Sequence, residues 1–214
     1  MKSILGAAFA LSACLLIAGC GIGTTPSSSA AQTSNAPKSS ISWPTPPHPM
    51  ELARKAGLVP EDYEHLEYHV HAHLDVFING KQVTVPAGIG INTKDPKVKH
   101  QKTAQGMVYG WITDCGHPCI SPLHTHDTTG VLHTETSKPR PNTLGEFFVE
   151  WNRRLTPTCV SSYCEPSTKI GIFIDGKRFH GDPRTILLAN HREIAIVIGK
   201  RPKYIPIAYN WSQL

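Results

Sequence analysis

The segment from His65 to Val76 alternates between polar and apolar residues without interruption. Successive side chains of a β-strand point to opposite faces of a sheet, so this period of two predicts a strand with one polar and one apolar face. The Asn79–Gly80 pair that follows is typical of a type I′ turn. The chain is therefore expected to turn back at once into a second strand at Lys81 to Val85.

One long helix is predicted to pack on the sheet. Thr143 and Glu146 have the spacing of a capping box, and apolar residues follow at helical spacing as far as Leu155. Pro157 interrupts this pattern, so we expect the helix at about 143–155. We interpret its apolar and aromatic stripe as core.

The remaining segments predict short strands and loops. A hairpin is expected at Leu123 to Glu135, with its turn centred on Thr128–Thr129. The other expected elements are a short helix at 51–56, a loop at 92–105, and strands at 107–112 and 194–198. Together these elements indicate an α+β fold, a sheet-dominated single domain with β-hairpins.

The polar face of the first strand carries three histidines in an HxHxH pattern. His69, His71 and His73 point to the same side of the strand, with neighbours about 6–7 Å apart. Two such neighbours can reach one metal ion. The third is then free to bind a second ion or to support the first.

The predicted hairpin supplies a second strip of histidines. If its turn is centred on Thr128–Thr129, His124 faces His133 across the strands, and His126 lies on the same face. Cβ atoms of such cross-strand neighbours are about 4.5–5.5 Å apart, so the three imidazoles suit a zinc or copper ion. Three acidic residues are candidates for acid–base or supporting roles: Glu135, Asp127 and Glu67.

The second strip is similar in geometry to the zinc sites of carbonic anhydrases and the metal sites of cupins. It departs from the cupin pattern, because Glu135 follows the third histidine of the strip and does not lie three or four residues after the HxH pair. The alternative interpretation is a solvated polar strand face that binds no metal. Six other histidines stand alone, and we interpret them as structural or surface residues: His48, His65, His100, His117, His180 and His191.

The N-terminus has the pattern of an export signal. Lys2 precedes an apolar run that ends in Ile17-Ala18-Gly19-Cys20, which resembles the lipobox of bacterial lipoproteins. The resemblance implies a signal peptide at 1–19 and a Cys20 that carries acyl chains such as palmitate. A second match ends at Cys14, but cleavage there would leave an apolar run on the mature chain.

This N-terminal pattern also predicts where the protein resides and how it is organised. We expect an extracytoplasmic protein, anchored by its lipid to a bacterial membrane. Residues 20–50 are rich in Ser, Thr and Pro and are expected to form a tether. Residues 51–214 are expected to form a single His-rich metal-binding domain.

Four cysteines follow the export signal: Cys115, Cys119, Cys159 and Cys164. An even number outside the cytosol favours two disulfides, and of three connectivities the local pairs are the simplest. The CxxxC loop with its histidine also resembles the copper-binding loop of membrane-anchored copper chaperones of the thioredoxin fold. The chain lacks the βαβ pattern of that fold, which favours disulfides.

Composition argues against a nucleic-acid partner and against an internal membrane-spanning segment. The net charge is only +5 and no basic run is longer than a pair, which argues against nucleic-acid binding. No run of 18 apolar residues follows the start, so no internal membrane span is expected.

Three blocks of the sequence resemble a group of exported bacterial proteins, many of them lipoproteins. The blocks are HAHLDVFINGK, PLHTHDTTGVLHTE and TLGEFFVEWN. The resemblance implies no activity.

Three interpretations of the function follow from these features. The first is a surface-anchored protein that sequesters or delivers copper or zinc. The second is a metal-dependent enzyme in which three histidines hold the ion and leave one position open for water, with a carboxylate as general base. A structural or adhesive lipoprotein is the third interpretation. A closed four-ligand shell would favour binding, whereas three ligands beside a concave pocket would favour catalysis.

Overall fold

The computed structural model describes residues 42–213. The predicted signal peptide, most of the predicted tether and Cys20 lie outside the described residues. The folded part nevertheless begins before the predicted boundary at Glu51. Trp43 is buried, its ring lies 5.4 Å from that of Trp151, and its carbonyl oxygen accepts a hydrogen bond from the Trp151 indole. Residues 42–50 therefore belong to the domain and not to the tether.

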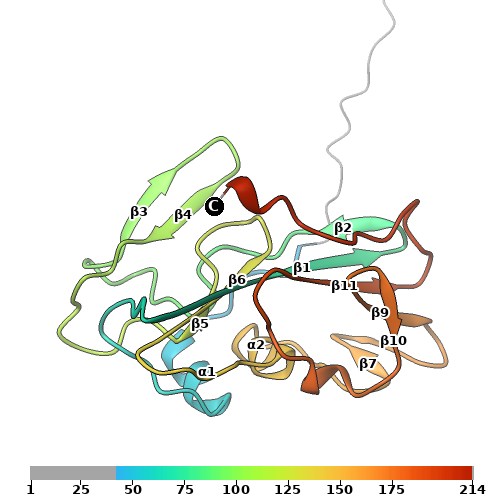
Figure 1. Ribbon diagram of the computed structural model, residues 1–214, viewed down its shortest axis with the longest axis horizontal. Helices are drawn as coiled ribbons and strands as arrows, with labels where there is room; N and C mark the ends of the chain where they lie inside the picture. Colours follow the sequence, from blue (N-terminus) through green and yellow to red (C-terminus); the bar gives the residue numbers. More distant parts are fainter. Residues whose placement is uncertain (1–41, 214) are drawn as a thin grey trace, which may run out of the picture. The chain divides into compact units, whose positions relative to one another are not determined.

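A seven-stranded sheet forms the centre of the molecule (Figure 1). The strand order is β10-β9-β11-β1-β6-β5, and β2 also pairs with β1. The long central β1 is parallel to β11, and the other pairs are antiparallel. The predicted α+β class is confirmed. The strands are β1 (Tyr68–Ile78), β2 (Lys81–Val83), β5 (Leu123–His124), β6 (Val131–Thr136), β9 (Ile170–Ile174), β10 (Lys177–Phe179) and β11 (Arg192–Ile198).

Short elements surround this sheet. Two small antiparallel pairs are β3 (Lys99–Lys102) with β4 (Met107–Gly110), and β7 (Cys159–Val160) with β8 (Tyr163–Cys164). The strand β3 lies in the segment predicted as a loop, because its exposed polar residues carry no apolar period and only pairing with β4 makes it a strand. The helices are α1 (Pro49–Lys55), α2 (Leu144–Glu150) and the short η1 (Pro183–Thr185) and η2 (Trp211–Gln213).

The helix α2 begins as predicted but ends early. The Thr143 side chain accepts a hydrogen bond from the Glu146 backbone, and Glu146 reaches back to the Thr143 backbone, as a capping box requires. The helix stops at Glu150 and not near Leu155, because Asn152 takes a left-handed conformation with φ of 51°. The predicted stripe is buried against the sheet as core.

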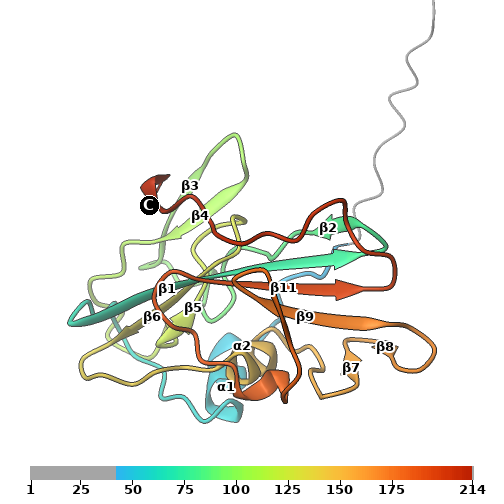
Figure 2. The same cartoon turned by 45° about the vertical axis from the view of Figure 1, so that its right-hand side comes forward.

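Both faces of the sheet are covered, which the alternating pattern of β1 did not predict. The helices α1 and α2 lie on one side, and the segment after β11 runs along the other (Figure 2). On that second side Phe77, Phe173 and Val197 form a small apolar cluster with Ile205. The polar face of β1 is consequently exposed only near its start, and from His73 onward it is buried.

The helix α2 also carries a buried carboxyl group. Replacing Glu150 by glutamine is expected to raise the free energy of unfolding at pH 7. Burial raises the pKa of Glu150 well above its usual range, and the neighbouring Ser121 side chain offsets only part of this rise. Above the unfolded-state pKa of about 4.3 the folded state holds a proton that the unfolded state has released, so stability falls as pH rises.

The Glu150→Gln substitution should raise the free energy of unfolding by more than about 1 kcal/mol at pH 7, since one unit of pKa elevation corresponds to about 1.4 kcal/mol. This gain should shrink towards pH 4, where both states of the wild-type protein hold the proton. Urea unfolding of the two proteins at both pH values measures the difference. A gain that does not change with pH would contradict the argument.

Candidate metal centre

The order of strands brings the two predicted histidine strips together on one face. Because β1 and β6 are neighbours, His71 lies opposite His133 and His69 lies opposite Glu135. The hairpin prediction that His124 faces His133 is confirmed by the β5–β6 register. His126 lies beyond the end of that ladder, where its carbonyl oxygen accepts a hydrogen bond from the Tyr109 backbone.

Four side chains surround one point on this face, and we call them the inner cluster: His124, His126, His133 and Glu135. One carboxylate oxygen, Glu135 Oε1, lies 3.7 Å from His124 Nε2, 3.7 Å from His126 Nε2 and 3.3 Å from His133 Nδ1. The two Nε2 atoms are 3.2 Å apart. His69 approaches from outside, with its Nε2 3.0 Å from the same oxygen.

Backbone carbonyl groups determine which nitrogen atoms of the inner cluster carry hydrogen. His124 Nδ1 donates to the Ser121 carbonyl at 2.9 Å, and His126 Nδ1 donates to the Tyr109 carbonyl at 2.6 Å. In the neutral tautomers both Nε2 atoms therefore bear lone pairs and face each other. Two lone pairs at 3.2 Å repel, so a cation must lie between them, either a proton or a metal ion. Metal-binding histidines usually have such a carbonyl partner.

The spacing of the inner cluster fits a small tetrahedral ion. Metal–nitrogen and metal–oxygen bonds of about 2.0–2.1 Å place neighbouring ligand atoms about 3.3–3.4 Å apart. The observed separations of 3.2 to 3.7 Å lie around this value. The inner cluster could thus hold a metal ion with only small side-chain movements.

The protonation states of this face also suit metal binding. Burial lowers the pKa of His71 to about 4 and that of His133 well below its usual range, so both rings are neutral near pH 7. Burial alone would raise the pKa of Glu135, but His124 and the surrounding hydrogen bonds bring it below its usual range. The cluster therefore presents an ionised carboxylate beside the neutral His133 ring, and this carboxylate raises the pKa of the buried His124 against the opposing effect of burial.

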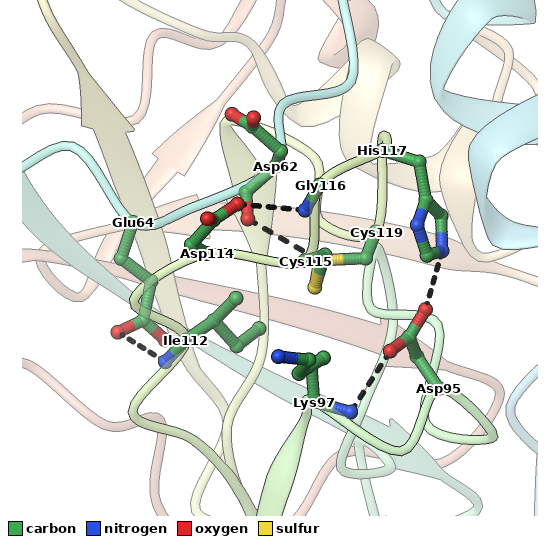
Figure 3. Close-up of a disulfide and its surroundings, with 10 residues drawn as sticks. All are labelled: Asp62, Glu64, Asp95, Lys97, Ile112, Asp114, Cys115, Gly116, His117 and Cys119. Carbon is green, nitrogen blue, oxygen red and sulfur yellow. Dashed lines mark hydrogen bonds and ion pairs between the residues drawn. A yellow bond between two sulfur atoms is a disulfide. The ribbon is translucent and has the colours of Figure 1, made fainter.

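A small second core holds the two carbonyl groups in place. Tyr109 packs against a cluster of buried side chains that includes Ile112, Ile120 and the Cys115–Cys119 disulfide. Ile120 directly precedes Ser121, so this core positions both carbonyl partners of the inner cluster. Figure 3 shows the disulfide loop beside the Asp62–Glu64 segment, where the Cys115 backbone donates to the Asp62 carbonyl at 2.8 Å.

Gly110 has no Cβ atom, which lets the His126 ring lie close to the backbone of β4. A Cβ atom at Gly110 would lie 2.9 Å from His126 Nδ1, and the residue has φ of 152°. A side chain at this position would displace the His126 ring from the Tyr109 carbonyl.

The local disulfide pairs predicted from the sequence are confirmed. Cys115 bonds to Cys119, and Cys159 bonds to Cys164. The sulfur atoms of the CxxxC loop are therefore not free thiolates. The loop histidine, His117, instead pairs with Asp95 at 2.7 Å (Figure 3).

Five predicted site residues lie outside the inner cluster. Two of them, His69 and His71, lie next to it and form a further group with His133, whose ligand atoms lie within 4.8 Å of one another. His73 is buried apart from His69 and His71 and contacts Glu193 at 2.9 Å. Asp127 accepts hydrogen bonds from the backbone and side chain of Thr129, because the tight turn needs a residue that satisfies its amide groups. Glu67 is exposed and pairs with His65 at 3.3 Å, because β1 begins only at Tyr68.

Glu193 is a residue of this region that sequence reasoning missed. It lies in strand β11 directly after Arg192, and it is the single charged residue of the buried run that follows, which is itself a signal of a specific partner. The carbonyl groups of Ser121 and Tyr109 carry no such signal, because every residue has one.

The inner cluster does not line the cavity beside it. That cavity, of about 220 Å³, is lined by the β3–β4 turn, residues 127–129 and Tyr209. In the described part of the chain, no helix is long and apolar enough to cross a membrane.

Fold and site together define a sheet-dominated α+β domain with buried histidine groups that could hold a metal ion. Comparison of the chain with protein-family models, with curated proteins and with solved structures found no match.

Proposed function

We propose that this protein binds a copper or zinc ion through the inner cluster, for sequestration or delivery of the metal. The observation that carries the proposal is the pair of Nε2 atoms 3.2 Å apart, each on a ring whose Nδ1 already donates to a carbonyl. Imidazole nitrogen suits both metals, and thiolate ligands are not needed. Glu135 completes four ligands, and His69 orients its carboxylate.

A closed shell of four protein ligands supports binding over catalysis, since a catalytic zinc site keeps a position for water. The alternative is a metal-dependent enzyme, in which Glu135 leaves the ion and acts as a base. One observation favours it: Glu135 Oε2 is buried and has no hydrogen-bond partner among the described residues. Spectroscopy of the bound metal separates the two, because only the enzyme alternative has three imidazoles and a water as ligands.

We also propose that the domain works outside the cytoplasm, tethered through an acylated Cys20. The lipobox resemblance supports the anchor, and the two disulfides support an oxidising compartment. In this setting the protein would bind metal at the membrane surface.

Elemental analysis of the natively purified domain is the direct test. We expect copper or zinc to remain with the protein through gel filtration and to be removed by a chelator at low pH, where protons compete for the imidazoles. A metal-free protein that also fails to bind Cu²⁺ or Zn²⁺ in a titration would contradict the proposal.

A further inference from the structure

A second group of ligand-type side chains lies further along β1, and we call it the His73 cluster. It consists of His73 and Asp75 on β1 and Glu193 on β11. The parallel register sets His73 directly opposite Glu193, and Asp75 follows two residues later on the same face. All three side chains are buried, with exposed fractions of 5%, 6% and 1%. The cluster shares no residue with the inner cluster.

The geometry of the His73 cluster is that of an incomplete coordination shell. His73 Nε2 donates to the Thr129 carbonyl at 2.8 Å, which leaves the Nδ1 lone pair facing the carboxylates in the neutral ring. His73 Nδ1 lies 2.9 Å from Glu193 Oε2 and 3.9 Å from Asp75 Oδ2. The second oxygen of Glu193, Oε1, is buried without a hydrogen-bond partner among the described residues.

The surroundings hold these side chains in place. The Gln82 side chain donates to Asp75, and the Tyr209 ring stacks on the His73 ring at 4.3 Å. On another side Gly130 allows close contact, since a Cβ atom there would lie 3.1 Å from His73 Nε2. Two carboxyl groups are thus buried next to one imidazole. An ion held between them would offset the cost of burying their charge.

We propose that the His73 cluster is a second metal site, which takes a divalent ion that accepts one imidazole nitrogen and carboxylate oxygens, such as zinc or manganese. The three ligand atoms lie within 4.8 Å of one another. The carbonyl partner of His73 and the amide partner of Asp75 are the outer contacts that metal ligands commonly have. Mixed nitrogen and oxygen ligands suit these ions better than they suit Cu(I).

Equilibrium dialysis of the purified domain against Zn²⁺, and separately against Mn²⁺, tests this second site. We expect Glu193→Gln to bind one equivalent of metal fewer than the wild type. Glu150→Gln is the matched control, because it also replaces a buried carboxyl group by an amide, outside both clusters. It should bind as many equivalents as the wild type. Circular dichroism of each metal-free variant checks folding, and Asp75→Asn serves as the second variant if Glu193→Gln does not fold.

His124→Ala separates this inference from the proposed function. Each site predicts the loss of one equivalent in its own variant, and the double variant His124→Ala/Glu193→Gln should lose both. If only Glu193→Gln loses metal, the second site stands and the proposed function fails. If Glu193→Gln and Asp75→Asn bind as much of both metals as the wild type, the His73 cluster holds only protons and the inference is overturned.

Discussion

Replacing His124 by alanine is expected to lower the affinity of the inner cluster for copper or zinc by more than about 100-fold. His124 is fully buried, its Nε2 faces both His126 and Glu135, and the Ser121 carbonyl fixes its tautomer. Loss of a partner that only supports a ligand already costs about 10–100-fold in affinity. Loss of a ligand should therefore cost more. Competition against a chelator of known affinity measures the change.

His100→Ala is the matched control for this substitution. His100 lies on the exposed strand β3 and belongs to neither cluster, so its removal should leave the affinity unchanged. Equal affinities of the His124 and His100 variants would show that the inner cluster is only a polar surface.

The two disulfides are expected to affect stability alike and metal binding differently. Removing either one, as Cys115→Ala/Cys119→Ala or as Cys159→Ala/Cys164→Ala, should cost about 2–5 kcal/mol in the free energy of unfolding. Only the first change should also lower metal affinity, by about 10-fold or more. The reason is that the Cys115–Cys119 pair belongs to the small core that holds the Ser121 and Tyr109 carbonyls.

The second disulfide provides the comparison within the same chain. It closes the β7–β8 pair near β9 and β10, at the far side of the sheet from β5 (Figures 1 and 2). Guanidinium unfolding and metal titration of both double variants give the two quantities. A loss of affinity of the same size in both variants would show that general destabilisation, and not the support of the carbonyl groups, weakens the site.

Local patterns determined the elements that carry the site. The alternation from His65 predicted β1, Asn79–Gly80 predicted its turn, and the hairpin register predicted that His124 faces His133. These features depend on contacts within a strand or across one short turn, which residue spacing describes directly. The helix end at Glu150 was not predicted, because the apolar period continues to Leu155 and gives no sign of the left-handed conformation of Asn152.

Only the tertiary structure decided how these elements combine into two clusters. The spacing of HxHxH could not show that the His69 and His71 side chains lie next to the inner cluster while that of His73 contacts Glu193, because Glu193 is 120 residues away from His73 along the chain. Strand order arises from the burial of apolar faces between layers, which involves contacts distant in sequence. The sequence likewise could not predict that the carbonyl groups of Ser121 and Tyr109 support the site, since every residue has a carbonyl group and only its position in the fold determines which group it contacts.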